Sequence, residues 1–173
     1  FSFRSIRVIF KIPTFRSPSL GYFGHMWELY AFWAFVPVMV LHYQNYNVIN
    51  IHPALLSSFI IASGAVGCVA GGLLSFRYGS ASVARVALIC SGLCCLLSPL
   101  MWNFSLQWFL LFMIFWGLTA AADSPQFSAL VARNAPEQIR GSAITLVVCI
   151  GFSITIVSIQ LLNTLQHIFP LDY

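Results

Sequence analysis

The stretch ALLSSFIIASGAVGCVAGGLLSF, residues 54–76, contains no charged side chain and is long enough to cross a membrane as one α-helix. A transmembrane helix needs about 20 consecutive apolar residues, because the hydrocarbon core of a bilayer is about 30 Å thick. The whole chain of 173 residues has this character, since 60% of it is hydrophobic, 7% is charged and the mean hydropathy is +0.88. Soluble domains carry about 25% charged residues, so the composition excludes a soluble globular protein.

Five apolar stretches of about this length follow one another along the chain. They are residues 20–42, 54–76, 82–101, 106–131 and 141–165. Residues 1–19 are expected to form a basic cytoplasmic linker, and residues 166–173 an external tail. The expected fold class is therefore an all-α membrane protein, a polytopic bundle of transmembrane helices in residues 20–165 without a soluble domain.

The basic residues all fall on one side of the membrane if these five spans are correct. They are Arg4, Arg7, Lys11, Arg16, Arg77, Arg85, Arg133 and Arg140. Cytoplasmic loops carry the excess of Lys and Arg, so we expect the N-terminus in the cytoplasm and the C-terminus outside. This topology explains the net charge of +4. Nucleic acid is not an expected partner, because its binding needs a denser basic patch.

Two acidic residues lie inside the spans, where a charged side chain costs about 2.5–3.5 kcal/mol on insertion scales. Glu28 is in the first span and Asp123 in the fourth, each about 12 Å from the cytoplasmic face at about 1.5 Å per residue. Residues three or four positions apart share a helix face, which gives each acid polar neighbours. These are Tyr22 and His25 for Glu28, and Thr119 and Gln126 for Asp123.

Two interpretations of these polar residues remain open. In the first, Glu28, Asp123 and His25 line a cavity and bind a substrate or take up a coupling proton. In the second, the acids only tie helices together, Glu28 by bonding a neighbouring helix and Asp123 by pairing with a basic residue. We favour the first because both acids lie at one depth. Pro125 supports it, since it frees the carbonyl of Ala121 and is typical of the discontinuous helices of transporter sites.

The remaining patterns predict helix packing and no catalytic chemistry. Small residues recur every four positions in the second span, which predicts close helix contact. The two rows are Ser63, Gly67 and Gly71, and Gly64, Cys68 and Gly72. The histidines and cysteines lack metal-ligand spacing, so neither a metal nor a cofactor is expected. The sequence has no phosphate-binding glycine loop, His-Glu-x-x-His pair or nucleophile elbow, so we do not expect an enzyme.

Three stretches resemble the major facilitator superfamily of transporters, specifically the C-terminal half of its bacterial twelve-helix members. Residues 20–31, LGYFGHMWELYA, are similar to the seventh helix. Residues 122–129, ADSPQFSA, are similar to the tenth, and residues 141–146, GSAITL, to the start of the eleventh. The resemblance covers nearly the whole chain from about Ser19 onward. It places Glu28 and Asp123 on helices that line the substrate cavity.

The connection after the second span, GLLSFRYGS at residues 72–80, resembles the cytoplasmic Gly-x-Leu-x-Asp-Arg-x-Gly-Arg motif of this superfamily. The matching positions are Gly72, Leu74, Arg77 and Gly79. Phe76 stands where the motif has Asp, and Ser80 where it has the second Arg. The match therefore supports the family resemblance and a cytoplasmic position for this loop. Because two charged positions of the motif are missing, it does not predict a charge relay between helices here.

The resemblance implies five helices of a six-helix half that is built from inverted three-helix repeats. It implies a secondary transporter that moves a small solute by alternating access, coupled to protons through Asp123 or Glu28. The expected partners are the lipid bilayer, a small-molecule substrate and the N-terminal half of the same transporter, and the expected location is the bacterial inner membrane. The rival hypothesis is a non-transporting membrane scaffold or assembly subunit, whose helices only pack against partner subunits.

Overall fold

The computed structural model describes residues 9–168, and within that range the chain forms helices and no strand. The α-helices are α2 (Pro13–Tyr46), α3 (Pro53–Tyr78), α4 (Ser80–Leu97), α5 (Leu106–Ala122), α6 (Ser124–Asn134) and α7 (Arg140–Ile168). Two 3₁₀ helices, Ser98–Asn103 and Glu137–Ile139, lie in the connections after α4 and α6. The predicted all-α fold class is confirmed.

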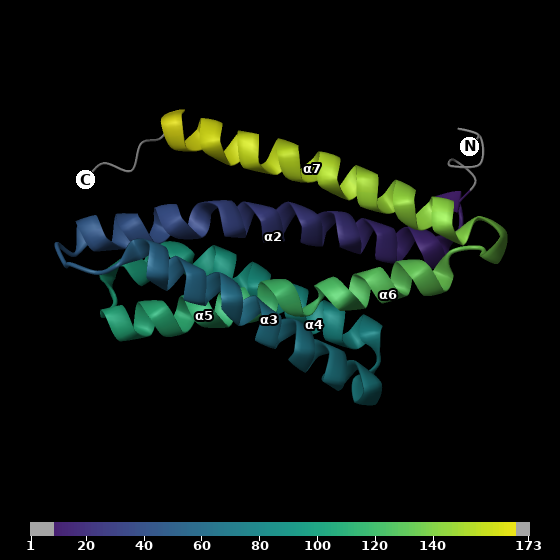
Figure 1. The fold of residues 1–173 in the computed structure, drawn as a ribbon, viewed down its shortest axis with the longest axis horizontal. Coiled ribbons are helices and arrows are strands. Elements are labelled where there is room, and N and C mark those ends of the chain that lie inside the picture. Colours follow the sequence, from purple (N-terminus) through teal and green to yellow (C-terminus); the bar gives the residue numbers. More distant parts are fainter. Residues whose placement is uncertain (1–8, 169–173) are drawn as a thin grey trace.

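Helix α2 occupies the middle of the bundle (Figure 1). It packs against α7 on one side and against α3 and α6 on the other, while α4 and α5 complete the layer beyond it. Two apolar clusters form the core, one around Tyr43 and Phe109 and the other around Phe15 and Val147. Residues from α2 belong to both clusters, so this helix connects the two parts of the core.

Several helix boundaries differ from those expected. Helix α2 begins at Pro13, so residues 13–19 are helical although we expected a linker there. Proline is favoured in the first turn of a helix, where its missing N–H is not needed. The last helix reaches Ile168, so residues 166–168 of the expected tail are also helical. Arg4, Arg7 and residues 169–173 lie outside the described residues.

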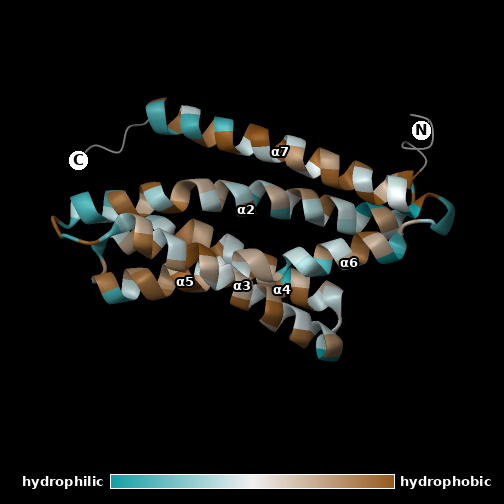
Figure 2. Ribbon diagram, viewed as in Figure 1, coloured by the Kyte–Doolittle hydropathy of each residue, from teal (hydrophilic) through white to brown (hydrophobic). Residues whose placement is uncertain are grey.

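Four segments of the described chain are long and apolar enough to cross a bilayer. They are Pro53–Tyr78, Ser80–Asn103, Leu106–Asn134 and Glu137–Ile168. Figure 2 shows hydrophilic residues mainly at the two ends of the bundle, with hydrophobic residues along the helices between them. The 34 residues of α2 are long enough to span, but this helix is less apolar and carries His25 and Glu28. That α2 is the first of five spans stays a prediction.

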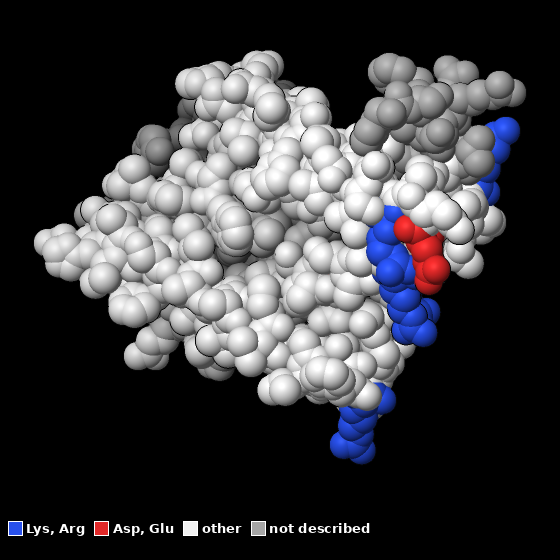
Figure 3. All heavy atoms as spheres, turned by 45° about the vertical axis from the view of Figure 1, so that its right-hand side comes forward, with Lys and Arg blue, Asp and Glu red and all other residues white. Residues whose placement is uncertain are grey.

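The basic side chains gather at one end of the bundle. On the face drawn in Figure 3, Lys and Arg (blue) lie along one edge of the molecule, with acidic residues (red) beside them. At this end Nη2 of Arg140 lies 3.7 Å from Oε1 of Glu137, and the two side chains form an exposed ion pair. The arrangement agrees with the one-sided distribution expected from the sequence for the residues that the structure describes.

Helices α3 and α5 pack closely because three glycines of α3 face the backbone of α5. A Cβ atom at Gly71 would lie 2.5 Å from the carbonyl oxygen of Ala122, and one at Gly67 would overlap the carbonyl oxygen of Leu118. A Cβ atom at Gly64 would lie 2.9 Å from the Cβ atom of Ala121 and 3.4 Å from the carbonyl oxygen of Gly117. The predicted close packing is confirmed for these three positions. Gly72 differs, since a Cβ there would meet no atom within 4 Å.

The connection expected over residues 77–81 is a single residue in the structure. Gly72 and Arg77 belong to α3, and Gly79 alone separates α3 from α4. Its φ of 81° is in the left-handed region that glycine adopts without a steric penalty. The glycine thus permits a tight reversal between two helices and leaves Arg77 in the last turn of α3.

The α3–α5 interface predicts different results for two matched glycine substitutions. Gly67→Ala should destabilise the protein by about 1–3 kcal/mol, because the added methyl group overpacks a backbone contact. Gly72→Ala should be neutral or stabilising by up to about 1 kcal/mol, since alanine favours the helix and meets open space. Thermal unfolding of the detergent-solubilised full-length protein measures both. Equal unfolding temperatures for the two variants would contradict the packing described.

Candidate functional site

The helix that we expected to run from residue 106 to residue 131 is broken at Asp123. Helix α5 ends at Ala122 and α6 begins at Ser124, so Asp123 is the single residue between them. Pro125 is in the first turn of α6, where it cannot donate a backbone hydrogen bond to Ala121. The Sγ of Cys68 on α3 instead donates to the Ala121 carbonyl at 3.2 Å. The carbonyl released by the proline is therefore paired across helices.

The carboxylate of Asp123 meets His25 of α2 in the interior. Oδ1 of Asp123 lies 2.8 Å from Nδ1 of His25, and both side chains are 2% exposed. The other ring nitrogen, Nε2 of His25, is buried and has no hydrogen-bond partner among the described residues. Burial of polar groups is costly unless they are paired. Oδ1 of Asp123 also makes no hydrogen bond among the described residues, so the 2.8 Å contact with His25 is the interaction that this buried atom has.

Close packing of three helices holds the two side chains together. On α2, Gly21 leaves space for the ring of Phe127 from α6, so these helices approach one turn before His25. The ring centroids of His25 and Phe127 are 6.1 Å apart. On the other side of α2, Gly151 of α7 lies against Tyr22. Helices α6 and α7 therefore fix the orientation of α2 at the level of His25.

Glu28 lies one turn further along α2 and accepts hydrogen bonds from side chains of two other helices. Its Oε2 accepts a hydrogen bond from Oγ of Ser91 on α4 at 3.0 Å, and its Oε1 accepts a longer one from Nε1 of Trp116 on α5 at 3.5 Å. Ser91 is fully buried, whereas Glu28 is half-buried. Glu28 is also one turn from His25 on α2, and His25 contacts Asp123. Both acids belong to one polar region that joins α2, α4, α5 and α6.

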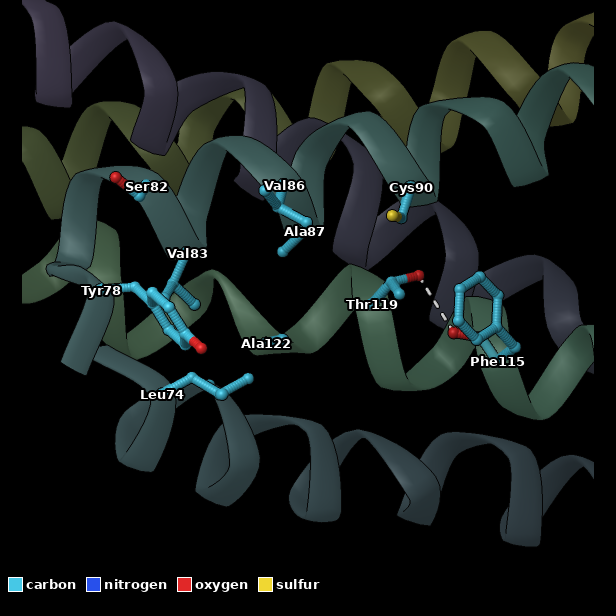
Figure 4. Close-up of a pocket in the computed structure, with 11 residues that line it drawn as sticks. Leu74, Tyr78, Ser82, Val83, Val86, Ala87, Cys90, Phe115, Thr119 and Ala122 are labelled. Atoms are coloured by element: carbon cyan, nitrogen blue, oxygen red, sulfur yellow. Dashed lines mark hydrogen bonds between the residues drawn. The ribbon is translucent and has the colours of Figure 1, made fainter. Parts of the chain in front are cut away.

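The sequence placed five residues in this site, and the structure brings three of them together. His25, Glu28 and Asp123 form the polar region. Gln126 is buried on α6, one turn beyond Asp123. Thr119 faces a different hollow, between α3, α4 and α5, and its hydroxyl donates to the Phe115 carbonyl of its own helix at 3.0 Å (Figure 4). That Thr119 also shares a cavity with Asp123 stays a prediction.

Two partners in this site were missed from the sequence. Ser91 lies in a strongly apolar stretch, and a polar residue there was a signal that could have been read as an interior hydrogen-bond donor. Trp116 gave no signal, because tryptophan is common in membrane helices. Within residues 9–168, no three residues among His, Cys, Asp and Glu converge as metal ligands.

A comparison with models of protein families gives one match. The model described as Major Facilitator Superfamily matches residues 1–159 of this chain. The chain belongs to the major facilitator superfamily. Comparisons with curated proteins and with solved structures give no match.

Members of the major facilitator superfamily are transporters rather than enzymes, so this chain belongs to a protein of membrane transport. Together with the four apolar helices, the assignment makes it an integral, multi-pass membrane protein. The buried polar region of this superfamily member lies where its helices meet in the interior and is surrounded by apolar side chains. Such groups in a membrane protein commonly mark substrate or ion pathways.

The His25–Asp123 contact predicts strong coupling in a double-mutant cycle. His25→Ala and Asp123→Ala should each destabilise the full-length protein by about 1–3 kcal/mol, because each leaves a buried polar partner unpaired. The double variant should lose less than the sum, with a coupling energy of about 0.5–3 kcal/mol. The exposed Arg140–Glu137 pair is the matched control, for which we expect about 0.5 kcal/mol or less. Chemical unfolding measures both cycles, and additive losses at His25 and Asp123 would refute the contact.

Proposed function

We propose that this chain forms part of a secondary transporter that moves a small solute by alternating access and is coupled to protons. In this proposal α2 is the first of five spans, the basic end of the bundle faces the cytoplasm, and the membrane is the inner membrane of a bacterium. A second helical half of the same transporter completes the substrate cavity, as in other members of the superfamily. The observation that carries the proposal is the buried pair of His25 and Asp123 at a helix break.

The charge of the pair explains how a proton can be coupled to a conformational change. A neutral imidazole beside an ionised Asp123 carries one net negative charge, and adding one proton to either group makes the pair neutral. A net charge in an apolar, closed site is costly. The pair is therefore stable in an occluded state when it holds the additional proton. Release of that proton requires contact with water, which alternating access supplies at one face at a time.

The helix break supplies a place where such a change can occur. No continuous helical hydrogen bonding crosses Asp123, because Pro125 cannot donate to Ala121. Discontinuous helices in transporters bend at such points and line the substrate site. A small rotation of α6 relative to α5 would alter the His25–Asp123 distance directly. The proton-binding group and the hinge are therefore the same residue in this proposal.

Glu28 is the second candidate for substrate or proton binding. Its carboxylate holds Ser91 and Trp116 at 3.0 and 3.5 Å, and the longer of these two bonds is weak. A solute with a hydroxyl or amino group could donate to Glu28 in place of Trp116, and only the weak 3.5 Å hydrogen bond would be lost. Gln126, buried beyond the break, offers a further polar side chain from the opposite helix.

Transport by variants of the full-length protein in proteoliposomes tests this proposal. The vesicles contain a pH-sensitive dye, and a panel of sugars, amino acids, organic acids and organic cations is added outside to find a solute whose uptake acidifies the interior. Asp123→Asn should reduce this solute-driven proton flux at least tenfold, because an amide cannot take up the proton. Glu28→Gln should weaken uptake of the solute or its coupling to protons.

Glu137→Gln is the matched control, since Glu137 is an exposed acid at the basic end and far from the polar region. It should leave proton flux unchanged. Unchanged gradient-driven uptake in both Asp123→Asn and Glu28→Gln would overturn proton coupling through these residues. Uptake without any proton movement would leave a transporter of another coupling type and would equally refute the proposal.

The alternative function is a membrane scaffold, and the paired state of both acids is the observation in its favour. Glu28 accepts hydrogen bonds from two neighbouring helices, and Asp123 contacts His25. Residues with a purely structural role make the same kinds of contact. A scaffold predicts that the interior never meets water. A transporter predicts that the region around the break opens transiently.

Thiol labelling distinguishes these functions. In a variant without the native cysteines, a cysteine at position 126 should react with a water-soluble thiol reagent, and a transported solute should slow that reaction. A cysteine at position 119 is expected to stay unreactive with or without the solute, because Thr119 lines an apolar groove on another side of the helix. A cysteine in place of Leu96, an exposed residue of an apolar span, is the control that should not react. Complete protection of position 126 under all conditions would favour the scaffold.

A further inference from the structure

A groove between α3, α4 and α5 is separate from the polar region described above. It has a volume of about 500 Å³ and is lined almost entirely by carbon atoms, with Leu74, Val86 and Phe115 among its walls. In Figure 4, Tyr78 and Leu74 lie at one end, and Cys90 and Phe115 at the other. Val86 is 61% exposed, so the groove is open at the surface of the bundle. Its shape and chemistry suit a flexible hydrocarbon chain.

The outer end of the groove carries two arginines. The guanidinium carbon of Arg77 lies 5.4 Å from the ring centroid of Tyr78, and Tyr78 lines the groove. Nη2 of Arg85 lies 3.5 Å from Oγ of Ser82, which also lines it, and Nε of Arg85 donates to the Ala81 carbonyl at 3.2 Å. Each cation thus contacts one residue of the lining, Tyr78 or Ser82, and Arg85 itself lines the neighbouring hollow between α2, α4 and α6.

Neither arginine has an acidic partner in the part of the chain that the structure describes. The ion pairs of residues 9–168 join His25 to Asp123 and Arg140 to Glu137. At position 76, directly before Arg77, the chain has Phe in place of the motif's acid. Arginine binds phosphate oxygens with paired N–H donors. Each guanidinium group therefore has N–H donors that no acid of residues 9–168 occupies, beside a residue that lines the apolar groove.

We infer that this groove binds an anionic phospholipid, with one acyl chain between α3, α4 and α5 and the phosphate held by Arg77 and Arg85. The dimensions agree with this occupant. Ser82 and Cys90 mark the two ends along α4, a distance of about 12 Å at about 1.5 Å per residue. This is less than half of the roughly 30 Å hydrocarbon thickness, so the groove lies within one leaflet.

The leaflet is the one that faces the basic end of the bundle, which is cytoplasmic in the orientation proposed above. Anionic lipids are attracted to basic residues at that surface, and basic pockets between membrane helices bind their headgroups. The inference rests on that orientation and on the family assignment, and it is independent of proton coupling. The inner end of the groove offers a lipid tail no competing polar site, because the Thr119 hydroxyl is bonded to its own helix.

Native mass spectrometry of the purified full-length protein tests the inference with defined lipids. The probes are phosphatidylglycerol, phosphatidylcholine with the same acyl chains, and glycerophosphoglycerol, which has the anionic headgroup and no chains. We expect tight binding of phosphatidylglycerol only. Arg77→Ala/Arg85→Ala should weaken it roughly 30-fold, as expected for two arginines at a membrane surface. Arg77→Lys/Arg85→Lys should weaken it less than the alanine variant does, because lysine keeps the charge but lacks the paired N–H donors.

Two further variants separate the headgroup from the chain. Arg133→Ala/Arg140→Ala removes the same charge from the same end of the bundle but not from the groove, and should leave the affinity nearly unchanged. Val86→Trp fills the open groove and should weaken phosphatidylglycerol with both arginines present. Equal binding of the two phospholipids, binding of the chain-free headgroup as tight as that of the lipid, or equal losses in the two double-alanine variants would overturn the inference. Since no solute is needed, failure here is distinct from failure of the proposed transport function.

Discussion

The contact between His25 and Asp123 is the interaction on which the interior of this protein depends. Each side chain is polar and buried among apolar helices, where neither is stable without a partner. Their 2.8 Å approach joins α2 to the junction of α5 and α6, at the one place where the helix is interrupted. The same contact therefore ties the position of α2 to that of the helix break.

The apolar helices lie around α2, whose polar residues face the interior. Helices α3, α4 and α7 are strongly apolar and expose large hydrophobic side chains, as helices in lipid do. Helix α2 lies in the middle, where its polar residues find partners on α4, α5 and α6. The glycines of α3 bring α5 close, and Cys68 then reaches the carbonyl that Pro125 leaves without its helical donor. The helix break is thus supported by packing from a neighbouring helix.

Apolar runs were enough to predict the class of the fold, because lipid imposes a length and a composition on each helix. Glu28 and Asp123 were also found from sequence, since charged residues are rare in such runs. Pairing was not predictable: His25 and Asp123 are far apart in the chain, and nothing in either stretch identifies the other as its partner. Pro125 indicated a discontinuous helix, but the sequence did not locate the end of α5 at Ala122, because a proline is also compatible with a continuous, kinked helix. The groove that Thr119 lines could not be predicted either, since it depends on how α3 and α4 pack against α5.

The most direct measurement is the ¹⁵N nuclear magnetic resonance signal of His25 in the full-length protein in lipid bilayers. The Nδ1 resonance of His25 should shift in Asp123→Asn, because Nδ1 lies against the Asp123 carboxylate, while the signals of the exposed residues His52 and His167 should stay in place. Lowering the pH should also change the His25 signal differently in the native protein and in Asp123→Asn, because only the native protein has a carboxylate beside Nδ1. A His25 resonance that is unaffected by Asp123→Asn at every pH would contradict the central claim.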